Sequence, residues 1–430
     1  MTGIGGARGG RLPVGVWAVT RAVILLCVLR VVRLPGPDVT SDVSVIYRGW
    51  SEVLRGGAFP LDDVTWQYPP GAALAVLSPG LLPFLDYTTA FVVLMLAADA
   101  AGLALLLRTA RRPGHRAAGV WVWIAGVALL GPTAYARYDL VVALVAAAAL
   151  CAAARRPRLA GALVGFGALL KVWPVLLLTG AALRGRPARS LWLAAAGTAA
   201  GLTALSTVAA PGALAFLTFQ RDRGTEIESL GGLVLHLARR AGWEGRVVLR
   251  YGSVEFVGPG VPLVSALSFA LTGAALAWLL RWRLRARETT AETLRDAAFT
   301  ATLLFTTTSR VISPQYVLWL VALAAVCMTA GTGRQALPVA LVLVAAGVTL
   351  LEFPVCFAHV VASDGLGTTL LALRNGLLVA ASLLACRRLS AVTRADGRRV
   401  PDGRTAARAH RPAARPLTPA APPHSPATAE

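Results

Sequence analysis

Residues 159–183 read LAGALVGFGALLKVWPVLLLTGAAL, an apolar stretch of membrane length that is broken by Lys171 and Pro174. Lys171 is the only lysine among the 42 lysines and arginines of the chain. A charged side chain in such a stretch costs about 2.5–3.5 kcal/mol or more unless it is paired, so it marks a functional site by default. A broken helix carrying an ammonium group suits a phosphate ligand. The alternative is a lysine that extends toward the membrane surface without a ligand.

The two flanks of this stretch predict how it crosses the membrane. Arginine clusters lie at 155–158 and at 184–189. Short arginine-rich loops stay in the cytoplasm, so both flanks are expected on the same side. This predicts a re-entrant hairpin with Lys171 near its outer tip, which is allowed where irregular backbone is buried in protein. The alternative is a true span at 159–183, which would break the charge rule at one loop.

Composition places the chain among polytopic membrane proteins. It has 430 residues, of which 56% are hydrophobic, and a soluble domain of this length does not have such a composition. The net charge of +21 lies in short loops, where it indicates topology rather than a nucleic-acid partner. The five cysteines are scattered without paired spacing, so neither a disulfide framework nor a metal site is predicted. The lipid bilayer is the first partner expected.

Ten other apolar stretches approach membrane length and are predicted to be spans. They lie at about 14–32, 88–107, 117–134, 139–154, 190–211, 261–281, 296–309, 315–330, 336–352 and 367–386. Residues 71–84 are short and interrupted by Pro79 and Gly80, so they are expected to dip into the membrane and return. Ten spans put both termini in the cytoplasm, with the protein in the plasma membrane.

Two domains follow from this pattern. Residues 1–386 form the predicted membrane domain. Residues 387–430 are rich in proline, alanine and arginine, cannot bury a core, and are expected to be a disordered basic tail in the cytoplasm. Nearly every acidic, aromatic or polar cluster outside the arginine loops falls on the predicted outer side, so any chemistry is expected there.

Two candidate site motifs lie early in the chain. The segment SDVSVIYRGW at 41–50 contains Asp42, a carboxylate close to the membrane that can act as a general base toward a sugar hydroxyl. An ordinary solvated loop acid is the other interpretation. The segment WQYPPG contains Trp66 and Tyr68, which are either an interfacial aromatic belt or a platform on which a sugar ring stacks.

Two further candidate motifs come later. The cluster FQRDRGTEIES contains Arg223 and Glu228, and SRVISPQYVLWL contains Arg310, Gln315 and Tyr316. A guanidinium group at the outer start of a span can bind phosphate with two hydrogen bonds. The alternatives are a solvated loop with ion pairs for the first motif and interfacial anchoring for the second.

Taken in order, these motifs resemble glycosyltransferase family 87. They are YPPGA at 68–72, RYDLVVALVAAAAL at 137–150, GALVGFGALLKVWPVLLL at 161–178, QRDRGTEIESL at 220–230 and SRVISPQYVLWL at 309–320. The resemblance covers roughly residues 20–385. It implies a GT-C fold, an all-α bundle of about ten to thirteen transmembrane or re-entrant helices with an outward-facing active site.

The resemblance also implies an activity. It implies inverting transfer of a sugar, most often mannose and in a known variant arabinofuranose, from a polyprenyl-phosphate donor to a cell-envelope glycan or glycolipid. The donor is a substrate, so no separate cofactor and no metal are expected. The family's catalytic aspartate corresponds to Asp42, with Asp38 as the competing residue. Leu61 and Gln67 depart from the family pattern, which weakens any role for Asp62 and Asp63.

Two other classes of protein remain to be compared. A transporter or flippase of lipid-linked sugars is expected to place charges near the middle of the membrane. The clear acid in the middle of a span is Asp99, whose simplest role is to pair with Arg21 of the first span. A non-catalytic scaffold would leave Asp42 and Lys171 without a role.

Overall fold

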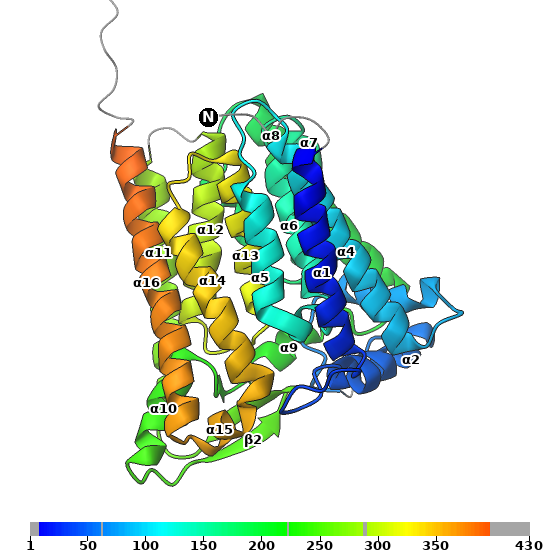
Figure 1. The fold of residues 1–430 in the computed structure, drawn as a ribbon, viewed down its shortest axis with the longest axis vertical. Helices are drawn as coiled ribbons and strands as arrows, with labels where there is room; N and C mark the ends of the chain where they lie inside the picture. Colours follow the sequence, from blue (N-terminus) through cyan, green and yellow to red (C-terminus); the bar gives the residue numbers. More distant parts are fainter. Residues whose placement is uncertain (1–7, 62, 222, 287–289, 396–430) are drawn as a thin grey trace, which may run out of the picture.

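The computed structural model describes residues 8–61, 63–221, 223–286 and 290–395. Within them the protein is a bundle of long helices with one small sheet at an end (Figure 1). The two ends of the bundle differ. The end that holds α2, α10, α15 and β2 is called the site end below. The end where α1 begins and α16 finishes is called the arginine end.

The helices and strands follow in chain order. The first half contains α1 (Arg8–Val28), η1 (Asp42–Tyr47), α2 (Arg48–Arg55), α3 (Ala72–Leu77), η2 (Ser78–Leu81), α4 (Tyr87–Ala110), α5 (Ala118–Leu130), η3 (Gly131–Tyr135), α6 (Asp139–Ala152), α7 (Pro157–Leu170), η4 (Trp173–Gly180), α8 (Arg186–Ala209) and α9 (Phe216–Arg221). The second half contains β1 (Thr225–Glu226), α10 (Leu230–Arg240), β2 (Arg246–Arg250), β3 (Ser253–Val257), α11 (Val261–Arg285), α12 (Ala291–Thr308), α13 (Tyr316–Ala330), α14 (Ala336–Leu350), η5 (Leu351–Val355), α15 (Phe357–Ala362) and α16 (Gly365–Ala395).

The apolar stretches of the sequence are these helices, which confirms an all-α polytopic membrane protein. Seven segments of the described chain are long and apolar enough to cross a membrane: α1, α4, α5 with η3, α8, α11, α14 with η5, and α16. Helices α6 and α13 are apolar but shorter, and α12 carries charged residues near its start. In lipid a helix satisfies its own backbone hydrogen bonds, which explains why these stretches are helical.

The stretch 159–183 is a hairpin, as predicted. Helix α7 ends where Lys171 adopts an extended conformation. The η4 segment then folds back, since Gly167 lies against Pro174 and Gly180 lies against the first turns of α12. Helices α7 and α8 run side by side in the same direction. The contacts show this, since Gly161 faces the Leu191 carbonyl and, one turn later in both helices, Gly165 faces the Ala195 carbonyl. A Cβ at these glycines would come within 2.1 and 2.4 Å of those oxygens. Both helices therefore begin at the arginine end (Figure 1), and the single-span alternative is wrong.

A second short insertion follows the same principle. Helix α3 and η2 together cover only part of the bundle's depth. The Tyr87 hydroxyl at the start of α4 donates to the Val76 carbonyl over 2.7 Å. The start of α3 packs on the tip of the hairpin, where Gly71 meets the Leu169 carbonyl. The segment thus dips in and returns at the site end, as its proline–glycine break predicted.

A three-stranded antiparallel sheet lies at the site end. The strand order is β1-β3-β2, with Glu226 opposite Glu255 and Val247 opposite Phe256. One face packs on a small core that includes Ile227 and Phe256. The sheet holds the polar segment before α10 against the bundle.

Asp99 is paired with Arg21, as predicted. Arg21 Nε lies 2.6 Å from Asp99 Oδ2. Three more groups donate hydrogen bonds to the same carboxylate: Trp17 Nε1, Trp123 Nε1 and the Tyr135 hydroxyl. A fully buried carboxylate with this many donors is a structural feature, so it does not favour a transport pathway.

The last helix is longer than expected. Helix α16 continues to Ala395, so the boundary placed between residues 386 and 387 falls inside a helix. The helix continues past the end of the apolar stretch because residues 387–395 contain no proline or glycine that would stop it. Residues 396–430 of the predicted tail lie outside the described residues.

The side of each end is testable by labelling in a cysteine-free background. Single cysteines at 249 and 358 occupy exposed positions at the site end, and one at 184 occupies an exposed position at the arginine end. Because arginine-rich loops remain in the cytoplasm, we expect an impermeant maleimide to label 249 and 358 in intact cells. Position 184 should react only after permeabilisation, and labelling of 184 in intact cells would reverse the orientation.

Candidate active site

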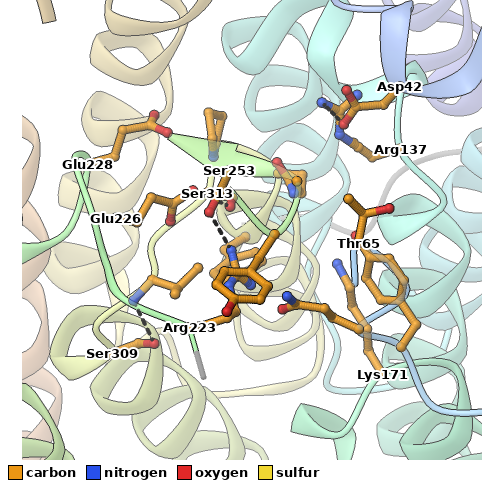
Figure 2. A pocket seen from close by; sticks show the side chains of 18 of the residues that line it. Asp42, Thr65, Arg137, Lys171, Arg223, Glu226, Glu228, Ser253, Ser309 and Ser313 are labelled. Atoms are coloured by element: carbon orange, nitrogen blue, oxygen red, sulfur yellow. Dashed lines mark hydrogen bonds and ion pairs between the residues drawn. The ribbon is translucent and has the colours of Figure 1, made fainter. Parts of the chain in front are cut away.

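One large cavity at the site end collects the predicted site residues. Its volume is about 850 Å³, and it is lined by the first loop, the hairpin tip, α9, β3, the turn between α12 and α13, and η5 (Figure 2). Eight of the nine residues selected from the sequence line it: Asp42, Tyr68, Lys171, Arg223, Glu228, Arg310, Gln315 and Tyr316. Residues that are far apart in the chain are therefore neighbours in one site.

Asp42 is held at the cavity wall by an arginine. It is the first residue of η1, and its side chain is 32% exposed. Arg137 Nη2 lies 2.6 Å from Asp42 Oδ2. Arg137 is itself anchored, because its Nη1 donates to the carbonyls of Val39 at 3.0 Å and Ala136 at 2.7 Å. The carboxylate is thus oriented yet open to the cavity.

Asp38, the competing residue, has a local role. Its Oδ1 accepts from the backbone and the hydroxyl of Thr40, at 2.9 and 2.8 Å. Its Oδ2 lies 3.0 Å from Arg30 Nη1. Both oxygens therefore stabilise the loop in which they lie, as expected of an acid that shapes a turn. This geometry favours Asp42 as the reactive carboxylate.

Of the adjacent acids at 62 and 63, the structure describes only Asp63, which is not placed as a base. Asp62 lies outside the described residues. Asp63 accepts from Trp50 Nε1 at 2.7 Å and from the backbone and hydroxyl of Thr65. Burial raises the pKa of Asp63, but the hydrogen bonds from Thr65 and Trp50 outweigh it and hold the pKa below its usual value. Asp63 therefore fixes its loop.

Lys171 is paired inside the protein. Its Nζ lies 2.6 Å from Asp139 Oδ1, and the same oxygen accepts from Trp319 Nε1 at 2.7 Å. Lys171 is only 7% exposed. An ammonium group that reached the membrane surface would have no such internal partner, so that alternative is wrong.

Aromatic rings surround the lysine. Its Nζ lies 5.2–5.4 Å from the ring centres of Tyr68, Tyr138, Tyr316 and Trp319. Such cation–π contacts stabilise an ammonium group that has lost its water. The lysine and the aromatic cluster thus form one rigid wall of the cavity.

Sequence reasoning missed the partners of both charged candidates. Arg137 and Asp139 belong to the RYD segment at the start of α6. In the sequence this segment indicated only the family resemblance, and it did not indicate a role for either residue. The available signal was electrostatic. A lone lysine inside a membrane segment requires an acid at the same depth, and Asp139 is the acid at the start of the preceding span, at the site end.

Trp66 lies elsewhere than expected. It is fully buried and does not line the cavity, whereas its neighbours Gln67 and Tyr68 do. Its ring packs edge-on against Trp50 and Tyr68, with centroids at 5.0 and 6.2 Å. Trp66 therefore supports Tyr68 from behind instead of contacting a ligand.

The motif after α12 faces inward. Tyr316 stacks on Trp319 with centroids 4.0 Å apart, and Trp319 stacks on Trp173 at 5.1 Å. Gln315 is 9% exposed and lines the same wall. These residues therefore build the cavity, and interfacial anchoring is not their main role.

Two arginines lie beside an apolar part of the cavity. Arg223 Nη2 donates to Ser253 Oγ at 2.7 Å, and its Nε lies 3.6 Å from Glu255 Oε1. The Arg310 guanidinium lies over the ring of Phe269, 4.3 Å from its centre. Apolar side chains continue the lining here: Phe216, Leu217, Phe305, Phe353 and Phe357. Fixed cations next to an apolar surface suit an anionic group attached to a hydrocarbon chain.

The remaining acidic groups are Glu226 and Glu228, both buried in the cavity wall. Burial raises the pKa of Glu226 even though Arg223 opposes the shift, and burial with the nearby Glu352 raises the pKa of Glu228 well above its usual value. Glu226 was not selected from the sequence, although it lies two residues before Glu228 and lines the same cavity.

A comparison with protein families matches residues 66–314 to glycosyltransferase family 87. The match covers more than half of the chain. The chain belongs to glycosyltransferase family 87. No curated protein matches the chain. The matched range contains the hairpin and most of the cavity wall of this family 87 glycosyltransferase, whereas Asp42, Gln315 and Tyr316 lie outside it and join the site through the geometry alone.

Proposed function

We propose that this family 87 glycosyltransferase moves a sugar, mannose in the first instance, from a polyprenyl-phosphate donor to a hydroxyl group of a cell-envelope glycan or glycolipid. The reaction takes place at the outer face of the plasma membrane and inverts the anomeric carbon. One observation carries the proposal: a single cavity joins an oriented carboxylate, a pair of arginines and an apolar lining. Arabinofuranose is the alternative sugar.

The donor phosphate is assigned to the arginine side of the cavity. Arg223 and Arg310 both line it, and Arg310 lies directly over Phe269 of α11. Helix α11 is largely unburied along its length, so it borders the bilayer. A prenyl chain in the bilayer can therefore reach the apolar lining while its phosphate meets the two guanidinium groups.

The chemical step assigns one role to each group. Asp42 takes the proton of the acceptor hydroxyl as that oxygen attacks the anomeric carbon. The bond between the acceptor oxygen and the anomeric carbon forms on the face opposite the phosphate, while the bond to the phosphate oxygen breaks. The electron pair leaves with the polyprenyl phosphate, whose growing charge is stabilised by Arg223 and Arg310. Arg137 positions Asp42.

Lys171 has a place in this scheme with Asp139. Its ammonium lines the cavity, and a lysine has three donors, of which Asp139 occupies one. The remaining donors are available to the leaving phosphate. The ion pair also holds in place the aromatic wall formed by Tyr68, Tyr316 and Trp319, which faces the sugar.

The direct test supplies the purified protein with radiolabelled polyprenyl-phosphate mannose or polyprenyl-phosphate arabinofuranose and a membrane extract as the acceptor. We expect consumption of one of the two donors with release of polyprenyl phosphate. Failure to consume either donor, in preparations that retain a cooperative thermal unfolding transition, would contradict the proposed activity.

The two arginines should act on the donor. Because a hydrogen bond to a charged group contributes about 1.5–3 kcal/mol, Arg223→Gln and Arg310→Gln should each lower kcat/KM for the donor about 10- to 100-fold. Acceptor KM should change less. Arg246→Gln, on the exposed edge of the same sheet, is the matched control and should retain activity. Equal losses of activity in all three variants would show that the substitutions disturb folding and do not act on donor binding.

A further inference from the structure

Glu226 and Glu228 form an acidic pair on one wall of the cavity. Glu226 ends β1 and Glu228 lies in the turn that follows, and both line the cavity, while Ile227 between them packs into the small core behind the sheet. Figure 2 shows the pair on the opposite side of the cavity from Asp42 and Arg137, with Arg223 between them.

Each glutamate has an oxygen without a partner. Glu226 Oε1 accepts from the Ser313 hydroxyl at 3.0 Å, but its Oε2 has no hydrogen-bond partner. Glu228 Oε1 also has none, while the Glu228 carboxyl group interacts with that of Glu352 on its other side. The two residues are only 3% and 4% exposed. Buried polar atoms in proteins are nearly always satisfied, so unsatisfied oxygens at a cavity wall indicate a ligand that donates hydrogen bonds.

The backbone of this pair is rigidly held. The Glu226 amide donates to the Arg310 carbonyl at 3.0 Å. The Glu228 carbonyl accepts from Arg374, whose guanidinium lies 3.1 Å from Glu352. Ser229 then caps α10 through the Gly232 amide. A site fixed on both sides in this way is suited to discriminate between similar ligands.

The chemistry of the pair selects the class of ligand. Two carboxyl groups offer a phosphate no positive charge, and in the described part of the chain no three His, Cys, Asp or Glu side chains are placed to hold a metal ion. The hydroxyl groups of a sugar are neutral donors, and carboxyl oxygens are their usual acceptors. The ligand that fits is therefore a polyhydroxylated ring.

We propose that Glu226 and Glu228 bind hydroxyl groups of the transferred sugar and thereby decide which donor sugar is accepted. This inference rests on the proposed function. The donor ring is favoured over the acceptor because the pair is adjacent to the arginines assigned to the phosphate, to which the donor sugar is bonded. Arg223 lies three residues before Glu226, and the Glu226 amide binds the Arg310 carbonyl. The acceptor is expected at Asp42, across the cavity.

The test measures transfer from the donor sugar that the wild type uses and from its deoxy analogues. For mannose these are the 3-, 4- and 6-deoxy forms, since removal of the 2-hydroxyl also changes the reactivity of the anomeric carbon. In the wild type, loss of a hydroxyl that a glutamate binds should lower kcat/KM about 10- to 100-fold. In Glu226→Ala or Glu228→Ala, the intact donor should lose about as much, and the same deoxy analogue should suffer no further loss.

Controls separate this inference from the proposed function and from folding. Glu226→Gln and Glu228→Gln keep the size of the side chain and replace the alanine variants if those fail to fold. They should also lower kcat/KM for the intact donor and reduce the discrimination against the deoxy analogue. Glu244→Gln, which is exposed, should retain the full discrimination of the wild type. Unchanged discrimination in the Glu226 and Glu228 variants, or a rise in acceptor KM alone, overturns the subsite. A wild type that transfers neither mannose nor arabinofuranose overturns the proposed function as well.

Discussion

Asp42→Asn should abolish sugar transfer from a polyprenyl-phosphate donor while the protein remains folded. A positioned general base contributes about 10²–10⁴-fold to the rate, and an amide cannot take the acceptor proton. Because asparagine keeps an oxygen that can accept from Arg137, which lies 2.6 Å from Asp42, the loop should keep its shape. The measurement is single-turnover transfer in membranes, with expression and thermal stability measured in parallel.

Asp38→Asn is the matched control for this change. Both residues lie in the same loop and line the same cavity, but the oxygens of Asp38 bind Thr40 and Arg30. We expect Asp38→Asn to lower activity only a few-fold, through a less ordered loop. If Asp38→Asn abolishes transfer and Asp42→Asn does not, the assignment of the base must move to Asp38.

Lys171→Met should destabilise the protein and impair donor use. Removal of one member of a buried ion pair leaves an uncompensated charge and costs about 3–5 kcal/mol. Here the charge left behind is Asp139, whose Oδ2 already lacks a hydrogen-bond partner. We expect a lower thermal unfolding temperature in detergent, together with a larger rise in the KM of the donor than in that of the acceptor.

The double variant Lys171→Met with Asp139→Asn separates structure from function. Replacing both members of a buried ion pair is often nearly neutral for stability, so the unfolding temperature should recover. Donor use should not recover if the lysine binds the leaving phosphate. Recovery of both stability and transfer would show that Lys171 only holds the aromatic wall together, and the phosphate role would be wrong.

Much of the fold could be predicted because its signals are local. Hydrophobic length and arginine position depend on composition within one segment, and they predicted the spans and the hairpin at 159–183. The end of α16 was missed because Arg387 marks a change in composition rather than a helix stop. The three-stranded sheet was also missed, since strands of two to five residues carry too little alternation to be recognised.

The candidate site divides in the same way. Four charged residues stand out in the sequence: Asp42, Lys171, Arg223 and Arg310. A charged residue near the membrane is costly whatever the tertiary structure, so it can be recognised from its own segment alone. The partners do not stand out. Asp139 looks like the first residue of a span, and Trp66 looks as available for stacking as Tyr68 until the loop path turns one ring inward and the other toward the cavity.

The sequence by itself determined that this chain crosses the membrane many times, returns at Lys171, and has its candidate site residues at one end of the bundle. Only the tertiary structure decided which charges meet: Arg137 with Asp42, Asp139 with Lys171, and the Glu226–Glu228 pair beside the arginines. The reason is physical. Burial of apolar length is a sum over neighbouring residues, whereas an ion pair depends on the distance between two atoms, which the packing of distant helices sets.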